Sequence, residues 1–242
     1  MMFRGRVALF AVALLPGAAM PMSGAADERE VARLEQAVTA NPEDLRVCAE
    51  YRQRIIASGD YDRAIRVLER LSIRTPSGPN VHVSLALAYV DKVPAVSPFR
   101  RIFLGRDALR AVSQAIALQP SLVAYYIRGL VELFYPEPLF HRARAGIDDL
   151  ERARGLLATL PDQPYHSRVY VSLGDGYWKV KDLGRAVSVW TNGLNRFPAN
   201  PALRRRLTNR GVDLDRIVGQ ALDPNARVDT SLQELFATAP AP

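Results

Sequence analysis

Residues 167–200 place small and bulky side chains at intervals that suit two antiparallel helices. Gly174 and Ala186 lack bulk where two such helices would cross closely. Larger side chains fill the space between successive helix pairs, and a proline ends the second helix because it cannot continue one. These residues are Tyr170, Leu173, Tyr177, Trp190 and Pro198. One unit of this kind cannot bury its apolar face alone, so the spacing predicts a stack of similar helix pairs.

This unit resembles the tetratricopeptide repeat (TPR), whose pattern has a bulky residue, Leu, Gly, Tyr, Ala, an aromatic residue, Ala and Pro at positions 4, 7, 8, 11, 20, 24, 27 and 32. Counted from Ser167, the chain departs from the pattern only at Gly193, which replaces the second Ala. Three weaker units are similar and cover residues 45–78, 79–120 and 122–160. In the first of these, Arg52 stands at the crossing position, which argues against close packing of its two helices.

The resemblance implies an all-α fold, a right-handed α-solenoid of antiparallel helix pairs with about four TPR-like units plus flanking helices. Apolar residues at helical spacing predict a lone helix before the units, over residues 30–42, and a cap helix after them, over residues 201–210. We divide the chain into a signal peptide, a TPR-like helical repeat domain and a partly disordered C-terminal extension, with the ranges 1–26, 27–211 and 212–242.

Two units are longer than the repeat period, and each is interrupted between its first and its second helix. Residues 91–104 contain two prolines and residues 135–141 contain another two, so neither stretch is expected to be a continuous helix. Equivalent turns of stacked repeats fall along one edge, so the two inserts should lie side by side. Their aromatic residues, Phe99 and Phe140 among them, either form a small separate core or present an apolar edge to a partner. The flanking residues are Arg100, Arg101, Arg142 and Arg144.

The N-terminus has the pattern of a secretory signal. A positive segment up to Arg6 is followed by an apolar stretch from Val7 to Leu15 and by small residues that end at Ala26. We expect export to the periplasm, cleavage near Ala26 and no integral membrane span after cleavage. An uncleaved membrane anchor is the alternative.

Charge and cysteine content exclude several classes of protein. Removing Arg4 and Arg6 lowers the basic count from 32 to 30 against 25 acidic residues, so the mature excess is +5. No dense basic stripe with interleaved aromatic residues is present, and nucleic-acid binding is not expected. The single cysteine, Cys48, excludes an internal disulfide and a cysteine zinc site. The three histidines are far apart and no catalytic motif is present, so we expect no enzyme activity, no metal and no cofactor.

In the TPR family the first helices of successive units line a concave groove that holds a peptide or a partner helix. Carried over by register, this implies partner-binding positions at polar residues, which either contact a partner or merely form a solvated face. They are Arg46, Gln53, Asn80, Arg168, Asp175 and Lys179. Tyr126 and Trp178 are the expected aromatic anchors, since partly exposed aromatic residues dominate many interfaces. The alternative for both is core packing. Phe99 and Phe140 are the candidates on the insert edge.

The resulting hypothesis is an exported protein–protein interaction module that binds a peptide or partner protein in the cell envelope as an adaptor or scaffold. The alternative is an accessory subunit needed for the activity or maturation of a periplasmic enzyme or transport system. The sequence does not determine the partner or the oligomeric state.

Overall fold

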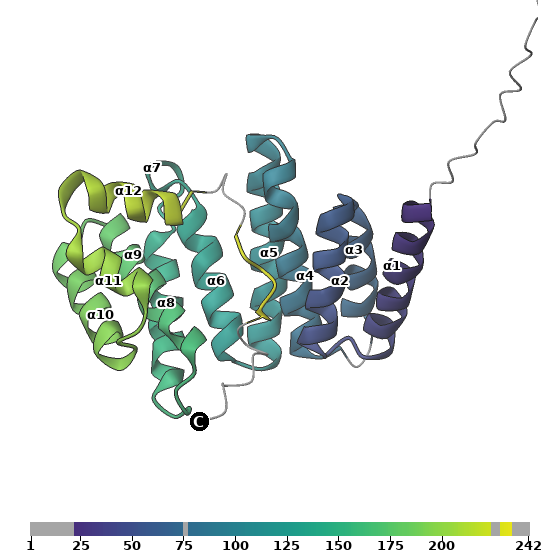
Figure 1. Cartoon of the computed structure of the whole chain (residues 1–242), viewed down its shortest axis with the longest axis horizontal. Helices are drawn as coiled ribbons and strands as arrows, with labels where there is room; N and C mark the ends of the chain where they lie inside the picture. The colour runs from purple at the N-terminus through teal and green to yellow at the C-terminus, as the bar shows by residue number, and fades with distance from the viewer. Residues whose placement is uncertain (1–21, 75–76, 224–227, 234–242) are drawn as a thin grey trace, which may run out of the picture.

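The computed structural model describes residues 22–74, 77–223 and 228–233, and within these ranges the chain is an all-α solenoid without strands (Figure 1). Four antiparallel pairs make up its body, which confirms the predicted fold class and the four units. The pairs are α2 (Leu45–Ser58) with α3 (Tyr61–Ser72), α4 (Pro79–Lys92) with α5 (Pro98–Leu118), α6 (Leu122–Phe134) with α8 (Ala143–Leu157), and α9 (Ser167–Lys179) with α10 (Leu183–Arg196).

Three helices flank these pairs. The expected first helix is present as α1 (Met22–Ala40), which begins before residue 30, where it was predicted to start, and the expected cap helix is present as α11 (Pro201–Thr208). The C-terminal extension begins with a further helix, α12 (Gly211–Ala221), whose Leu214 and Val218 join the apolar core. Most of the predicted signal peptide and the last residues of the chain, predicted to be disordered, lie outside the described residues.

Short polar side chains fix where the helices begin. Asp44, Asp60, Ser121, Asp182 and Asn200 each precede a helix and accept a hydrogen bond from a backbone N–H of its first turn. This satisfies donors that have no partner inside the helix. Gly59 ends α2 with φ at 77°, a left-handed conformation that favours glycine.

Glycines set the closest helix crossings. A Cβ atom on Gly174 would overlap the indole ring of Trp190, which is fully buried against α9. Where α6 crosses α8, a Cβ on Gly129 would lie 2.9 Å from the carbonyl oxygen of Gly146. The expectation that Gly174 serves packing is confirmed. In the first unit, where Arg52 replaces the crossing glycine, α2 packs less extensively on α3 than the helices of the other pairs pack on each other.

The first insert is not a continuous helix, as predicted, but most of its second half is helical. Residues 98–104 are not a loop but the first turns of α5, because Pro98 occupies the first helical position, where its missing N–H costs nothing. A 3₁₀ turn, Val93–Ala95, joins α4 to α5. The second insert is an extended turn that contains one short helix, α7 (Glu137–Phe140). The Tyr135 hydroxyl donates to the carbonyl of Ile102 at 3.0 Å, so the two inserts lie side by side, as predicted.

Candidate functional site

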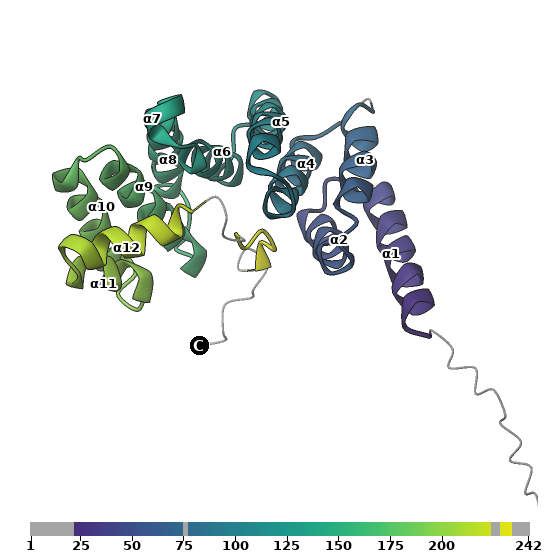
Figure 2. The same ribbon diagram turned by 90° about the horizontal axis from the view of Figure 1, so that it is seen from above.

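The helices form an arc, and the chain's own C-terminal segment lies inside it. Figure 2 shows the arc open toward residues 228–233, drawn in yellow, which we call the tail segment. In Figure 1 the same segment runs alongside α5, without helical structure from Val228 to Ser231 and with a turn at Leu232, whose φ is 57°. The segment therefore occupies part of the concave face on which the sequence places a groove.

A buried ion pair holds the centre of the tail segment. Arg52 of α2 donates from Nη1 to Asp91 Oδ2 of α4 at 2.7 Å, and both side chains are almost fully buried. The second guanidinium nitrogen, Nη2, donates to the carbonyl oxygen of Thr230 at 2.6 Å. The Thr230 hydroxyl donates to Asp91 Oδ1 and accepts from Gln53 Nε2 at 3.4 Å. Main chain and side chain of Thr230 are thus both recognised.

Neighbouring tail residues have contacts of their own. Val228 lines an apolar cavity, and Leu232 packs against the apolar core formed by the N-terminal half of the array. Asp229 lies 3.4 Å from Arg168 of α9. Burial raises the pKa of Asp229, but hydrogen bonds from Ser231 and Arg168 outweigh it and leave that pKa below its ordinary value. The tail segment therefore touches α2, α4 and α9, which come from both halves of the array.

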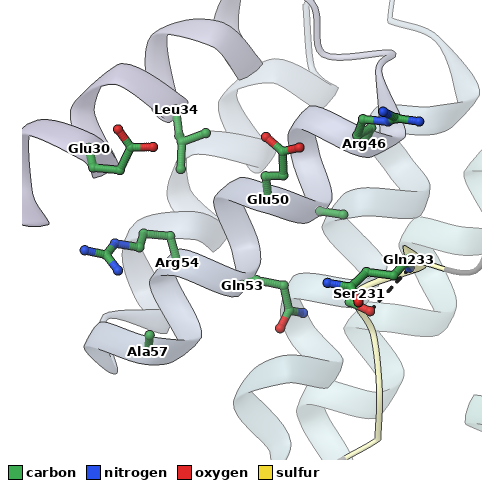
Figure 3. A pocket seen from close by; sticks show the side chains of 10 residues that line it. Glu30, Leu34, Arg46, Glu50, Gln53, Arg54, Ala57, Ser231 and Gln233 are labelled. Atoms are coloured by element: carbon green, nitrogen blue, oxygen red, sulfur yellow. Dashed lines mark hydrogen bonds between the residues drawn. The ribbon is translucent and has the colours of Figure 1, made fainter. Parts of the chain in front are cut away.

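The concave face stays open on both sides of the tail segment. Between α1, α2 and the tail lies a cavity of about 720 Å³ whose wall includes Arg46 and Gln53 (Figure 3). Its other polar side chains, among them Glu50 and Arg54, carry both signs of charge. A second hollow of about 790 Å³ lies beside α9. Its lining includes Tyr126, Arg168 and Val171. Four predicted residues, Arg46, Gln53, Tyr126 and Arg168, thus line these two open stretches.

Three other predicted residues have structural roles instead. Asp175 was expected to be accessible, but only 2% of it is exposed, and its carboxylate binds Arg206 of α11 through two hydrogen bonds of 2.5 Å. Lys179 donates to the carbonyls of Leu133 and Tyr135 at the end of α6, the second at 2.8 Å. Burial lowers the pKa of Lys179.

The third correction is Asn80. Its side-chain amide donates to the carbonyl of Glu43 at 2.9 Å, and its backbone N–H donates to the Glu43 carboxylate, also at 2.9 Å. Asn80 therefore fastens the start of α4 to the turn before α2. The repeat pattern places these polar residues on the first helices of the units. It does not show which of their side chains bind a neighbouring helix or turn.

Two of the remaining aromatic candidates, Phe99 and Phe140, line a cavity whose wall also includes Asp91 of the ion pair and Val228 of the tail segment. Trp178 is half-buried, and the Lys181 ammonium lies 4.7 Å from its ring centroid. Phe140 stacks edge-on against Tyr135 and is half-buried, whereas Phe99 is 69% exposed and stacks on Phe103. Phe99 and Phe140 line one apolar cavity of about 530 Å³ between the inserts, so the inserts are part core and part open edge.

Sequence reasoning missed the contact that holds the tail segment, which Arg52 and Asp91 make with Thr230. One signal was present, because Arg52 stands where the repeat pattern has glycine. A charged residue at a crossing position needs a partner, and the periodicity did not indicate that this partner was Asp91 of the next unit. In residues 22–74, 77–223 and 228–233 no group of three His, Cys, Asp or Glu side chains is placed to bind a metal. None of the helices described is both long and apolar enough to cross a bilayer.

Comparison with known proteins bears on the fold. No protein-family profile matches the sequence, and no curated protein matches it. Among solved structures, TTC0263, a thermophilic TPR protein from Thermus thermophilus, is similar with a TM-score of 0.55 and 21% identity over 77% of this chain and 91% of that one. The protein MamA is similar with a TM-score of 0.50 and 18% identity over 73% of this chain and 91% of that one. The chain has the tetratricopeptide-repeat fold.

Proposed function

We propose that the protein is an exported interaction module that binds a segment of a partner protein along its concave face, as an adaptor or scaffold in the cell envelope. The observation that carries the proposal is the tail segment itself, a stretch of chain that is not helical up to Leu232 and is seated on that face. Its contacts combine a hydrogen bond to the main chain, a hydrogen bond to a side chain and apolar packing. A surface that holds one segment in this way suits another of similar chemistry.

The open stretches on either side of the tail segment supply further contact area. Arg46 and Gln53 line one of them, and Tyr126 and Arg168 line the other. A tyrosine and an arginine in one hollow are residue types that dominate binding energy at protein interfaces. The role proposed for this face is binding and not catalysis.

Capture from the envelope fraction tests this role. Arg46→Glu combined with Tyr126→Leu should reduce the recovered partner at least tenfold, because interface hot spots contribute about 2 kcal/mol or more each. The matched control is Arg66→Ala combined with Gln114→Ala on α3 and α5, whose exposed side chains line a different hollow. Recovered proteins are identified by mass spectrometry. Equal capture by the groove variant and the wild-type chain would contradict the proposal.

The alternative role, an accessory subunit, predicts a different phenotype. Loss of such a subunit changes the activity or maturation of a particular envelope enzyme or transporter, whereas loss of an adaptor separates two proteins that otherwise co-purify. Deleting the gene and assaying the captured partner's own activity distinguishes the two.

Export itself is tested by the mass of the intact protein. The chain recovered from the envelope should begin near Asp27, since the apolar stretch and the small residues before it have the pattern that signal peptidase cleaves. Leu14→Arg, which interrupts that apolar stretch, should leave the uncleaved precursor. A cytosolic species that retains Met1 in the wild-type strain would refute export.

A further inference from the structure

The contacts of Thr230 also bear on which partner segments bind to the concave face. We propose that the groove selects partner segments that carry a threonine or serine at the place of Thr230, between Arg52 and Asp91, and that the tail segment competes with the partner for this place. This inference rests on the proposed function and specifies the class of partner.

The preference for threonine or serine follows from the hydrogen bonds that the Asp91 carboxylate accepts. Its Oδ2 accepts from Arg52, and its Oδ1 accepts from the Thr230 hydroxyl. Only 5% of Asp91 is exposed, so water does not readily replace a missing donor. A segment with an apolar side chain at this place would leave a buried carboxylate oxygen unsatisfied, which is costly. The carboxylate therefore favours a side chain that donates a hydrogen bond and is as small as threonine or serine.

Arg52 contributes a hydrogen bond that does not depend on the sequence of the bound segment. Its Nη2 binds a main-chain carbonyl, which every residue has. Its Nε is buried and has no hydrogen-bond partner while the tail segment is in place. The tail segment thus leaves one donor of the site unsatisfied. A partner segment that supplies an acceptor there gains a contact that the tail does not make.

Apolar residues on both sides of Thr230 complete the pattern. Val228 precedes it by two residues and lines the cavity between the inserts, and Leu232 follows it by two and packs on the core. The favoured partner segment therefore has an aliphatic residue two places before and two places after its Thr or Ser, and a small residue directly after it, where Ser231 is buried in the tail segment.

The tail segment competes with a partner segment because it belongs to the same chain as the groove. The tail segment follows α12 in the same chain, so its local concentration at the groove is of the order of millimolar. An outside segment must displace it. Weakening the tail without changing the groove should therefore expose the site to added peptide.

The test uses the full chain and two labelled peptides, measured by fluorescence anisotropy. One peptide has the sequence of residues 226–236, and the other has valine in place of the threonine. Thr230→Val in the chain should bind the threonine peptide at least tenfold more tightly than the wild-type chain does. It should also prefer the threonine peptide to the valine peptide by at least tenfold, the effect of losing one hydrogen bond to a charged group.

Two control chains isolate the hydroxyl. Thr208→Val removes a hydroxyl that donates to the carbonyl of Arg204 on α11, and it should bind as the wild-type chain does. Thr230→Ser keeps the donor and should also bind as the wild-type chain does. Circular dichroism of each variant establishes that it is folded.

Each outcome decides a separate point. Equal affinity of Thr230→Val for both peptides would overturn hydroxyl selection while leaving the groove a peptide site. Equal affinity of wild-type and Thr230→Val chains for the threonine peptide would overturn competition by the tail. Binding of neither peptide would overturn both parts of the inference, and the envelope capture experiment then decides separately whether the groove binds a partner.

Discussion

Gly174→Leu should lower the free energy of unfolding by about 3 kcal/mol, the upper end of the usual cost of overpacking. Any side chain at this position overlaps the indole of Trp190, which has no free space to move into because it is fully buried. For a chain of this size the melting temperature should fall by about 6 to 12 °C. Thermal and denaturant unfolding followed by circular dichroism measure both quantities.

The matched control is Gly219→Leu. A Cβ on Gly219 of α12 meets nothing within 4 Å, and the residue is exposed. The same substitution there should leave stability within about 0.5 kcal/mol of wild type or raise it, since leucine favours a helix more than glycine does. If both variants lost stability equally, the close crossing of α9 and α10 would not be what limits residue size at Gly174.

Arg206→Leu should destabilise the chain by about 3 to 5 kcal/mol at pH 7, because it leaves a buried carboxylate without its partner. In the wild-type chain, burial raises the pKa of Asp175 and Arg206 opposes that rise. Removing Arg206 raises this pKa further. Because the folded pKa then lies above the unfolded value of about 3.9, stability recovers as the pH falls through the folded pKa toward about 3.9. Urea unfolding at several pH values measures this.

Two variants separate the buried charge from other effects. Arg205→Leu changes an exposed neighbour on the same helix and should alter stability by no more than about 0.5 kcal/mol. Combining Arg206→Leu with Asp175→Leu removes both charges and should restore most of the lost stability, since apolar replacements of a buried ion pair are often neutral. A double variant as unstable as Arg206→Leu at every pH would show that the loss comes from packing and not from the unpaired carboxylate.

The helix pairs were predictable because their determinants are local. Gly174, Ala186 and Trp190 lie within one unit, and their spacing alone specifies two crossing helices. The first insert was harder to predict, because Pro98 has opposite meanings inside a helix and at its first position. Composition does not distinguish the two cases. Only the preceding turn, Val93–Ala95, shows that a helix begins there.

The site was less predictable than the fold because its contacts join residues far apart in sequence. Asp175 and Gln53 are both polar residues at groove positions, and nothing nearby in the sequence shows that Arg206 binds the first while Thr230 of the tail segment contacts the second. The partner of Arg52 lies 39 residues away at Asp91, and its other contact lies 178 residues away at Thr230. The repeat pattern does not predict contacts between residues that lie so far apart in the sequence.

The position of the tail segment also bears on how the array unfolds. In a solenoid each unit contacts only its neighbours, so disorder can begin at either end and spread one unit at a time. Here a segment that follows the last helix is fastened between α2 and α4, near the opposite end. This contact ties the two ends into one cooperative unit. Displacement of the tail segment by an outside segment would release this contact, so backbone amides in the first helix pair would then exchange with solvent independently of the C-terminal helices.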